Sequence, residues 1–303
     1  MQTSKWQRDK GLTARMTLSF VVLGLLYLLF LTVLAAYFNL GIVPLMFIAG
    51  FMIMIQWYFS DRIVLWSTGA KIVSREQYPE LHAIVENLVA KANLPKPKVA
   101  VIQTDIPNAF ATGKSLRSSV VTVTTGLMRI LEEDELEGVI AHELTHVKNR
   151  DVTVITLASL FSTIAWFVMQ STMYSSFGYG YGRRQQGGGI WLVFLVAAIV
   201  WFLSFLIIRA ISRYREFAAD RGGAYMTGKP LKLSNALMKI SGRIKVTPKN
   251  ELKKVEGMNA FFIIPAVGGS IASLFSTHPP VEARIKRLMD IEAAMRGSRE
   301  AYR

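Results

Sequence analysis

The sequence predicts an α-helical membrane protein that also carries an α+β domain outside the membrane. Two observations point to this fold class. Apolar residues make up 51% of the chain and charged residues only 18%, whereas about 25% of the residues in an average soluble domain are charged. Long stretches without a charge also alternate with segments of mixed composition, which is the pattern of membrane spans joined to water-soluble segments.

Four apolar runs contain most of this excess: 16–38, 42–59, 152–174 and 190–208. The first carries no charge and is about as long as a helix that crosses a hydrocarbon core of roughly 30 Å, so we expect it to be a retained span. The second run returns across the membrane, and the third and fourth form another hairpin, which gives about four transmembrane helices. Because Ser and Thr residues dilute the third run, a buried or interfacial helix is the alternative there.

The positions of Lys and Arg predict how these spans are oriented. The positive-inside rule places the N-terminus and the segments after the second and fourth runs in the cytoplasm, although Arg183 and Arg184 oppose this assignment. We therefore expect a multi-pass protein of the cell (plasma) membrane. It divides into an N-terminal transmembrane hairpin (1–60), the first part of a cytoplasmic domain (61–151), a second transmembrane or membrane-associated hairpin (152–208) and the second part of the cytoplasmic domain (209–303).

The charge balance and the lack of cysteine exclude other classes of function. The net charge is +14, but many Lys and Arg residues flank the apolar runs, where contact with anionic lipid headgroups accounts for them. We therefore expect the lipid bilayer as a partner, and no nucleic acid. With 0 cysteines the chain has no disulfides and no thiolate ligands, so any metal must be bound by His and carboxylate side chains.

The polar segment before the third run predicts a small sheet and two helices. Apolar residues recur at helical spacing within 75–93, and both 99–102 and 120–125 are rich in Val and Thr, as β-strands are. Between these strands, 108–113 is predicted to be an edge strand or a loop. The acidic cluster 132–135 then suits the first turn of a second helix.

This second helix contains the sequence HELTH, which matches the pattern H-E-x-x-H. His142 and His146 are four residues apart, so both imidazoles project from one helical face and can bind the same zinc ion. Glu143 can then take a proton from water that the metal acidifies, which is the chemistry of amide hydrolysis. The alternative is a chance match within an amphipathic helix. Against it, two of the chain's four His residues fall in the motif.

A catalytic zinc site needs a third protein ligand and an open position for water. The best candidate is Glu216, on another expected helix that follows the fourth run. Asp220, one turn along, could hydrogen-bond a ligand histidine and fix its tautomer. Ala218 and Ala219 would let this helix approach the motif helix closely. The alternative is a solvated charged face at the membrane boundary.

These motifs resemble those of the HtpX-like membrane metalloproteases, which are related to the CAAX prenyl proteases. The resemblance covers most of the chain. It includes the N-terminal hairpin and the segments 107–113, 139–146, 216–220 and 277–280, followed by Arg284 and Ile285. It implies a zincin-like (gluzincin) α+β catalytic domain in which the H-E-x-x-H helix packs near a small sheet.

Matching positions imply the metal ligands and the group that transfers protons. His142, His146 and Glu216 would bind one zinc ion per chain. Glu143 would be the general base or acid, and Asp220 would take the family's acidic position behind the ligands.

The resemblance also implies roles for four residues outside the ligand set. Asn108 and Ala109 match the family's edge-strand segment, whose backbone would pair with an extended substrate. His278 matches a downstream histidine that would stabilise the oxyanion, with support from Arg284. Judged from their sequence context alone, Asn108 would be a turn residue and His278 a cap or loop residue.

The sequence therefore favours a zinc-dependent membrane endopeptidase that hydrolyses peptide bonds on the cytoplasmic side. By family analogy, its substrates would be misfolded or damaged membrane proteins or unfolded polypeptides, in protein quality control and stress response. A CAAX-type prenyl-protein protease is the alternative enzyme, but the short chain and few predicted spans disfavour it. A non-catalytic membrane scaffold with a vestigial metal site is the third hypothesis, and the intact triplet of His142, Glu143 and His146 argues against it.

Overall fold

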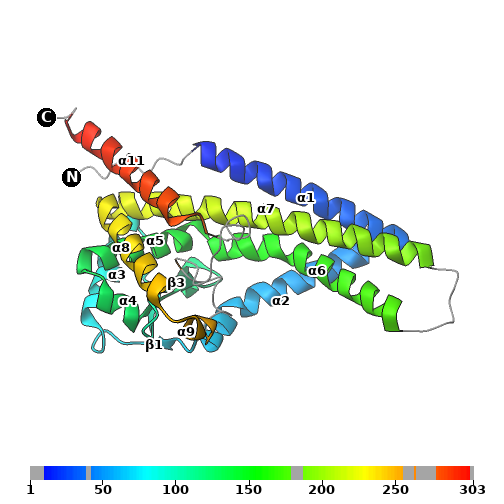
Figure 1. The fold of residues 1–303 in the computed structure, drawn as a ribbon, viewed down its shortest axis with the longest axis horizontal. Coiled ribbons are helices and arrows are strands. Elements are labelled where there is room, and N and C mark those ends of the chain that lie inside the picture. The colour runs from blue at the N-terminus through cyan, green and yellow to red at the C-terminus, as the bar shows by residue number, and fades with distance from the viewer. Residues whose placement is uncertain (1–9, 39–41, 179–186, 255–262, 264–277, 301–303) are drawn as a thin grey trace. The chain divides into compact units, whose positions relative to one another are not determined.

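A computed structural model describes most of the chain (Figure 1). It leaves out residues 1–9, 39–41, 179–186, 255–262, 264–277 and 301–303. Residues 39–41, between the first and second apolar runs, and the pair Arg183 and Arg184 lie outside the described residues. The chain forms two compact units. The sheet unit contains Phe59–Val152 and Ser212–Arg303, and the helical unit contains Lys10–Tyr58 and Thr153–Ile211.

The helical unit is built from parts of four apolar helices. They are α1 (Lys10–Phe38), α2 (Ile42–Thr68), α6 (Asp151–Gly178) and α7 (Gly187–Thr227). Phe30, Ala165 and Ala197 are fully buried in its core. The hydroxyl group of Tyr27 donates a hydrogen bond to the carbonyl oxygen of Ala158 over 2.7 Å. Small side chains at such contacts let helices pack closely, as they do in membrane bundles.

Two helices are long and apolar enough to cross a membrane by length and composition. These are the stretches Lys10–Tyr37 of α1 and Trp191–Thr227 of α7. The second and third apolar runs also form helices, but within the described residues neither α2 nor α6 meets the same criterion. Within the described residues there are thus two candidate spans, and the side chains of several residues of α2 and α6 are not among those described, so the predicted number of about four is not confirmed.

The sheet unit contains a four-stranded sheet in the order β1-β2-β4-β3. Its strands are β1 (Lys71–Ile72), β2 (Lys98–Ile102), β3 (Ala109–Thr112) and β4 (Val120–Thr124). Strands β2 and β4 are parallel, and β1 and β3 pair antiparallel with them. The two predicted strands are confirmed, and 108–113 contains an edge strand of this sheet. Strand β1 was not predicted because two exposed residues carry no alternating pattern.

The helices of the sheet unit begin and end where the local sequence allows. They are α3 (Pro79–Ala92), α4 (Thr125–Ile130), α5 (Glu133–Asn149), α8 (Pro230–Val246), α9 (Lys249–Lys254) and α11 (Val281–Glu300), with a short 3-10 helix at Leu116–Ser118. Helix α3 starts later than predicted because Pro79 occupies its first turn, and it ends at Asn93 in a left-handed conformation. Helix α5 is the predicted motif helix. Glu132 and Glu135 form its capping box, and left-handed Arg150 ends it.

Helix α5 lies within the core of the sheet unit, in contact with the sheet, α3 and α8 (Figure 1). Val139 and Ile140 of α5 are fully buried together with Leu233 and Leu237 of α8. Gly138 permits this close packing, because a Cβ atom there would lie 3.2 Å from the backbone of Leu233. The helix that carries the HELTH sequence is therefore held by packing along its length.

We predict that Leu237→Ala destabilises the sheet unit. Leu237 is fully buried, and truncation of such a leucine leaves a cavity that costs about 2–5 kcal/mol of unfolding free energy. The neighbouring Met238 is 49% exposed, so Met238→Ala is a matched control. Thermal unfolding of the detergent-solubilised protein should show a lower midpoint for Leu237→Ala and an almost unchanged midpoint for Met238→Ala. Equal midpoints would contradict this packing.

Candidate metal centre

Two histidines of α5 face the same point in the sheet unit. His142 and His146 are one helical turn apart, and their Nε2 atoms lie 3.1 Å from each other. Their rings meet edge to face, with centroids 4.8 Å apart. The spacing of four residues therefore brings both imidazoles to one helical face, as predicted.

Helix α7 brings a carboxylate to these two histidines. Glu216 Oε2 lies 3.5 Å from His142 Nε2, and Glu216 Oε1 lies 3.4 Å from His146 Nε2. One ligand atom from each residue lies within 4.8 Å of the others, so the group could hold a metal ion. Ligands of a tetrahedral zinc ion, bound at about 2.05 Å, are roughly 3.3 Å apart. The observed separations match that geometry.

The helix that carries Glu216 differs from the expectation. The sequence predicted a separate helix after the fourth apolar run, but α7 is one continuous helix from Gly187 to Thr227. No proline or glycine occurs between Trp191 and Asp220 to interrupt it.

The second ring nitrogen of each histidine faces a buried carboxylate. His142 Nδ1 lies 3.0 Å from Asp220 Oδ1, and His146 Nδ1 lies 2.5 Å from Asp151 Oδ2. A carboxylate accepts hydrogen bonds, so each neutral imidazole donates from Nδ1 and keeps a lone pair on Nε2. With both imidazoles neutral, two lone pairs and the Glu216 carboxylate converge on one point. Burial by itself lowers the pKa of both histidines, but hydrogen bonds to the neighbouring carboxylates outweigh it and raise this pKa, so the point favours positive charge. The donor set therefore fits a metal ion.

Asp220 is held in turn by Arg284 of α11. The guanidinium group donates to Asp220 from Nε over 2.8 Å and from Nη2 over 2.6 Å. Its Nη1 donates to the carbonyl oxygen of Ile263 over 2.8 Å. Burial by itself lowers the pKa of Arg284, but the charges of Asp220 and Glu216 outweigh it and raise this pKa, so the guanidinium group stays protonated. Arg284 thus fixes the carboxylate behind His142.

Glu143 is buried next to the first ligand histidine. Burial raises the pKa of its carboxyl group, and the charges of His142 and His146 only partly offset this effect. A carboxyl group with a raised pKa suits proton transfer near neutral pH.

His278 lies beside the carboxylate of Glu216, with its Nδ1 atom 3.1 Å from Glu216 Oε2. It is buried and shortly precedes α11, the helix that carries Arg284. The structure therefore brings His278 to the metal centre and places Arg284 against Asp220. Thr277, from the same matched segment, lies outside the described residues.

Asn108 and Ala109 lie at the start of the edge strand β3, which contacts α5. The Asn108 carbonyl oxygen accepts from the Thr124 N–H over 3.0 Å, and the Asn108 N–H donates to Thr124 Oγ1 over 2.9 Å. The side-chain Oδ1 of Asn108 accepts from the N–H of Ile263 over 3.0 Å. Asn108 therefore links the edge strand to Ile263, whose carbonyl oxygen is bonded to Arg284. Asn108 is therefore not simply a turn residue.

Two residues at the site were missed from the sequence, Asp151 and Gly223. Asp151 contacts His146 and lies 3.0 Å from Arg215 Nε. Its sequence signal is an acidic residue directly after the end of the motif helix. At Gly223 α7 passes close to α5, because a Cβ atom there would lie 3.0 Å from the backbone nitrogen of His142. A glycine within a helical pattern was its signal.

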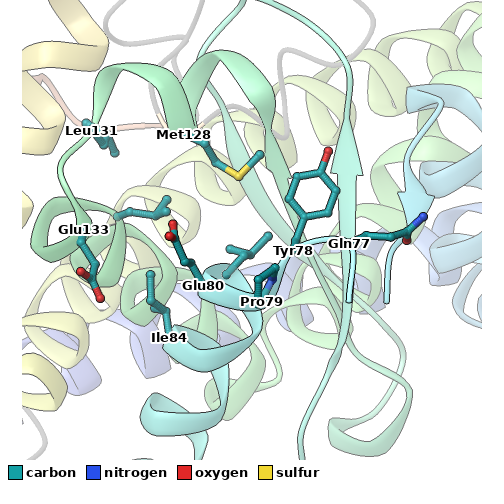
Figure 2. A pocket seen from close by; sticks show the side chains of 10 residues that line it. Gln77, Tyr78, Pro79, Glu80, Ile84, Met128, Leu131 and Glu133 are labelled. Carbon is teal, nitrogen blue, oxygen red and sulfur yellow. The ribbon is translucent and has the colours of Figure 1, made fainter. Parts of the chain in front are cut away.

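A separate hollow of about 330 Å³ opens beside the first turn of α5 (Figure 2). Tyr78, Glu80, Met128 and Glu133 are among its lining residues. Glu133 precedes His142 by nine residues of the same helix, which is ~14 Å along the helix axis. The hollow is therefore distinct from the metal centre.

The sequence matches the profile of peptidase family M48 over residues 75–292. The chain belongs to this family. Protease HtpX homolog 2 of Methanosarcina mazei is 53% identical over 293 residues, which cover 96% of this chain and 99% of that protein. Protease HtpX homolog of Moorella thermoacetica is 54% identical over 291 residues, which cover 95% of this chain and 96% of that protein. This M48 chain is therefore a membrane metalloprotease that acts on polypeptides.

A solved structure, that of S. mikatae Ste24p, shares the fold. The TM-score is 0.56 at 20% sequence identity, and the match covers 90% of this chain. It covers 64% of Ste24p, so the M48 chain spans less than two thirds of the length of that protein. At this identity the likeness concerns the fold alone.

We predict that Gly223→Ala weakens both the fold and the metal centre. The added methyl group would press on the backbone of His142, and overpacking of this kind costs about 1–3 kcal/mol. Gly242→Ala is the control, because a Cβ atom at Gly242 meets nothing within 4 Å. Metal affinity, measured by competition with a chromogenic chelator, should fall for Gly223→Ala and stay constant for Gly242→Ala. Unchanged affinity and stability in Gly223→Ala would show that α7 and α5 have room to separate.

Proposed function

We propose that this M48 protease is a zinc-dependent endopeptidase in which His142, His146 and Glu216 bind one zinc ion per chain. The observation that carries this assignment is the convergence of two Nε2 atoms and one carboxylate, separated by 3.1, 3.4 and 3.5 Å. Two imidazoles and one carboxylate are a ligand set of catalytic zinc sites that keep a fourth position open. Thiolate zinc sites are excluded because the chain has 0 cysteines.

The residues around the ligands have complementary roles in this proposal. Zinc bound there supplies Lewis-acid chemistry, in that it polarises the carbonyl group of the scissile bond and acidifies water. Glu143 accepts the proton of the attacking water and delivers it to the leaving amine. Asp220, oriented by Arg284, holds His142 in the tautomer that leaves Nε2 free. His278 stabilises the negative charge that develops on the carbonyl oxygen.

We assign substrate binding to the edge strand, at Asn108 and Ala109. Strand pairing alternates along β3. Because the Asn108 carbonyl oxygen faces β4, the backbone groups of Ala109 point away from β4. A peptide that adds to such an edge is bound through its backbone, with little dependence on sequence. This binding mode suits unfolded or membrane-protein substrates, so we assign the enzyme to quality control of misfolded or damaged membrane proteins during stress.

The proposed enzyme crosses the plasma membrane four times, with its N-terminus and catalytic domain in the cytoplasm. Hairpins at 1–60 and 152–208 alternate with the two parts of the catalytic domain, 61–151 and 209–303. The two candidate spans and the basic residues beside the apolar runs support this arrangement.

Single cysteines test the topology, because the chain has none of its own. Arg117→Cys lies on the exposed surface of the sheet unit, and Gln185→Cys lies between the third and fourth apolar runs. In spheroplasts, a membrane-impermeant maleimide should label Gln185→Cys and leave Arg117→Cys unlabelled until the cells are lysed. Labelling of Arg117→Cys in intact spheroplasts would place the catalytic domain on the outer side.

The catalytic assignment is tested with Glu143→Gln and Glu216→Ala. The proteins are purified in detergent with chelator, and zinc and an unfolded model membrane protein are then added. We expect wild type to cleave, Glu143→Gln to bind zinc but lose at least about 100-fold in rate, since a general acid–base contributes 10²–10⁴-fold, and Glu216→Ala to lose zinc. Asp105→Asn, which alters an exposed ion pair with Arg129, is the control that should keep full activity.

Equal cleavage by wild type and Glu143→Gln would sink the catalytic assignment. Full zinc retention in a folded Glu216→Ala protein would show that Glu216 is not a zinc ligand. A protein that neither binds zinc nor cleaves would be the scaffold with a vestigial site. A prenyl-protein protease is the second candidate, because the motifs of this chain also resemble those of the CAAX prenyl proteases, so a farnesylated peptide is added as a competing substrate. Preferential cleavage of that peptide would establish the second candidate.

A further inference from the structure

The chain reverses direction directly behind the second ligand histidine. Helix α5 ends at Arg150, whose φ of 56° is left-handed, and α6 begins at the next residue, Asp151. This reversal brings the Asp151 carboxylate back to His146, five residues earlier in the sequence. The side chain of Asp151 is almost completely buried.

Each oxygen of Asp151 has a different partner. Oδ2 lies 2.5 Å from Nδ1 of His146, and Oδ1 forms an ion pair with Nε of Arg215 at 3.0 Å. Arg215 precedes Glu216 on α7. Consecutive residues of α7 therefore act on His146 from two sides: Glu216 faces its Nε2 atom, and Arg215 holds the carboxylate at its Nδ1 atom.

The first ligand histidine has the same arrangement, in which the histidine contacts a carboxylate and the carboxylate contacts a guanidinium group. There the chain of contacts runs from His142 to Asp220 and on to Arg284. At the second it runs from His146 to Asp151 and on to Arg215. The two series share no residue, although each has its histidine on α5 and one further member on α7. Each histidine thus has its own buried carboxylate, and each carboxylate has its own guanidinium group.

We propose that Asp151, held by Arg215, is the positioning residue of His146, and that this pair sets the metal affinity of the site. Asp151 fixes the ring orientation and keeps the proton on Nδ1, so that the Nε2 lone pair points to the ligand position. Partners of this kind typically change metal affinity 10–100-fold when they are mutated. The inference rests on the zinc centre proposed above, and its test separates the two.

Two substitutions test the positioning role of Asp151. Asp151→Asn keeps the shape of the side chain but removes its charge, so it should weaken zinc binding by about 10–100-fold. Arg215→Gln leaves Asp151 in place and should give a smaller loss. Because Arg215 acts through Asp151, adding Arg215→Gln to Asp151→Asn should cause little further loss. Asp105→Asn is the matched control, since the Asp105–Arg129 pair is exposed and belongs to the same unit.

Zinc affinity is measured on the full-length protein in detergent by competition with a chromogenic chelator. Thermal unfolding is recorded with excess chelator and again with excess zinc, because a ligand that binds the native state raises the midpoint according to its affinity. A positioning role predicts a smaller zinc-induced shift in Asp151→Asn. With cobalt in place of zinc, the visible absorption bands of Asp151→Asn should also move, since the environment of His146 changes.

Wild-type affinity in Asp151→Asn, with a midpoint that is lower by a similar amount in chelator and in zinc, would overturn the inference and leave Asp151 a purely structural residue. Full additivity of the two substitutions would overturn the link through Arg215. If Asp151→Asn does not fold, the Arg215→Gln variant tests the inference instead. Wild-type zinc affinity in Arg215→Gln would then overturn the inference. Failure of the wild type itself to bind zinc would overturn the zinc centre as well.

Discussion

Helix α7 passes so close to α5 that a Cβ atom on Gly223 would lie 3.0 Å from the backbone nitrogen of His142. The metal centre depends on this contact. It places Glu216 against both ligand histidines and Asp220 against the far side of His142. Since α5 is itself packed against the sheet and α8, the position of α7 determines whether the three ligand atoms converge.

This convergence places several charged side chains in a buried region of the sheet unit. The ion pairs between these side chains explain why the site is stable. Glu216, Asp220 and Asp151 supply three carboxylates, whereas Arg284 and Arg215 supply two guanidinium groups. Buried charges are tolerated when each has a partner and hydrogen bonds. These carboxylates outnumber the two guanidinium groups even before the buried Glu143 is added. A divalent cation between the two histidines and Glu216 would reduce this excess, so the electrostatics and the geometry favour the same occupant.

The parts of the site predicted from sequence are those encoded by local spacing. The i, i+4 histidines of α5 lie on one face because any helix places them there. The Val- and Thr-rich strands and the edge strand at 108–113 also follow from short patterns, and Asp220 falls one turn after Glu216. Family resemblance supplied His278, which has no local signal.

The parts that sequence could not predict depend on tertiary contacts. The partners of Asp151 were missed because Arg215 is distant in sequence and because the reversal at Arg150 is a left-handed residue that is not a glycine. Arg284 was expected near the ligands, but its hydrogen bonds to Asp220 and Ile263 could not be predicted from the sequence. A close approach was expected at Ala218 and Ala219, and the one at Gly223, one turn further along α7, was not foreseen. Which face of a helix meets another helix is decided by packing, and that information is spread over the whole chain.

The ligand set is divided by the apolar segments, and this division gives the metal a role in folding. His146 and Glu216 lie on either side of 152–208, so a bound ion cross-links two distant parts of the chain. Closing a loop of that length is entropically costly, although the cost grows only slowly with length. The ligands are not arranged for the metal in the unfolded chain, so binding free energy becomes folding free energy. Metal binding at these three residues would therefore be coupled to the folding of the segment that lies between His146 and Glu216 in the sequence.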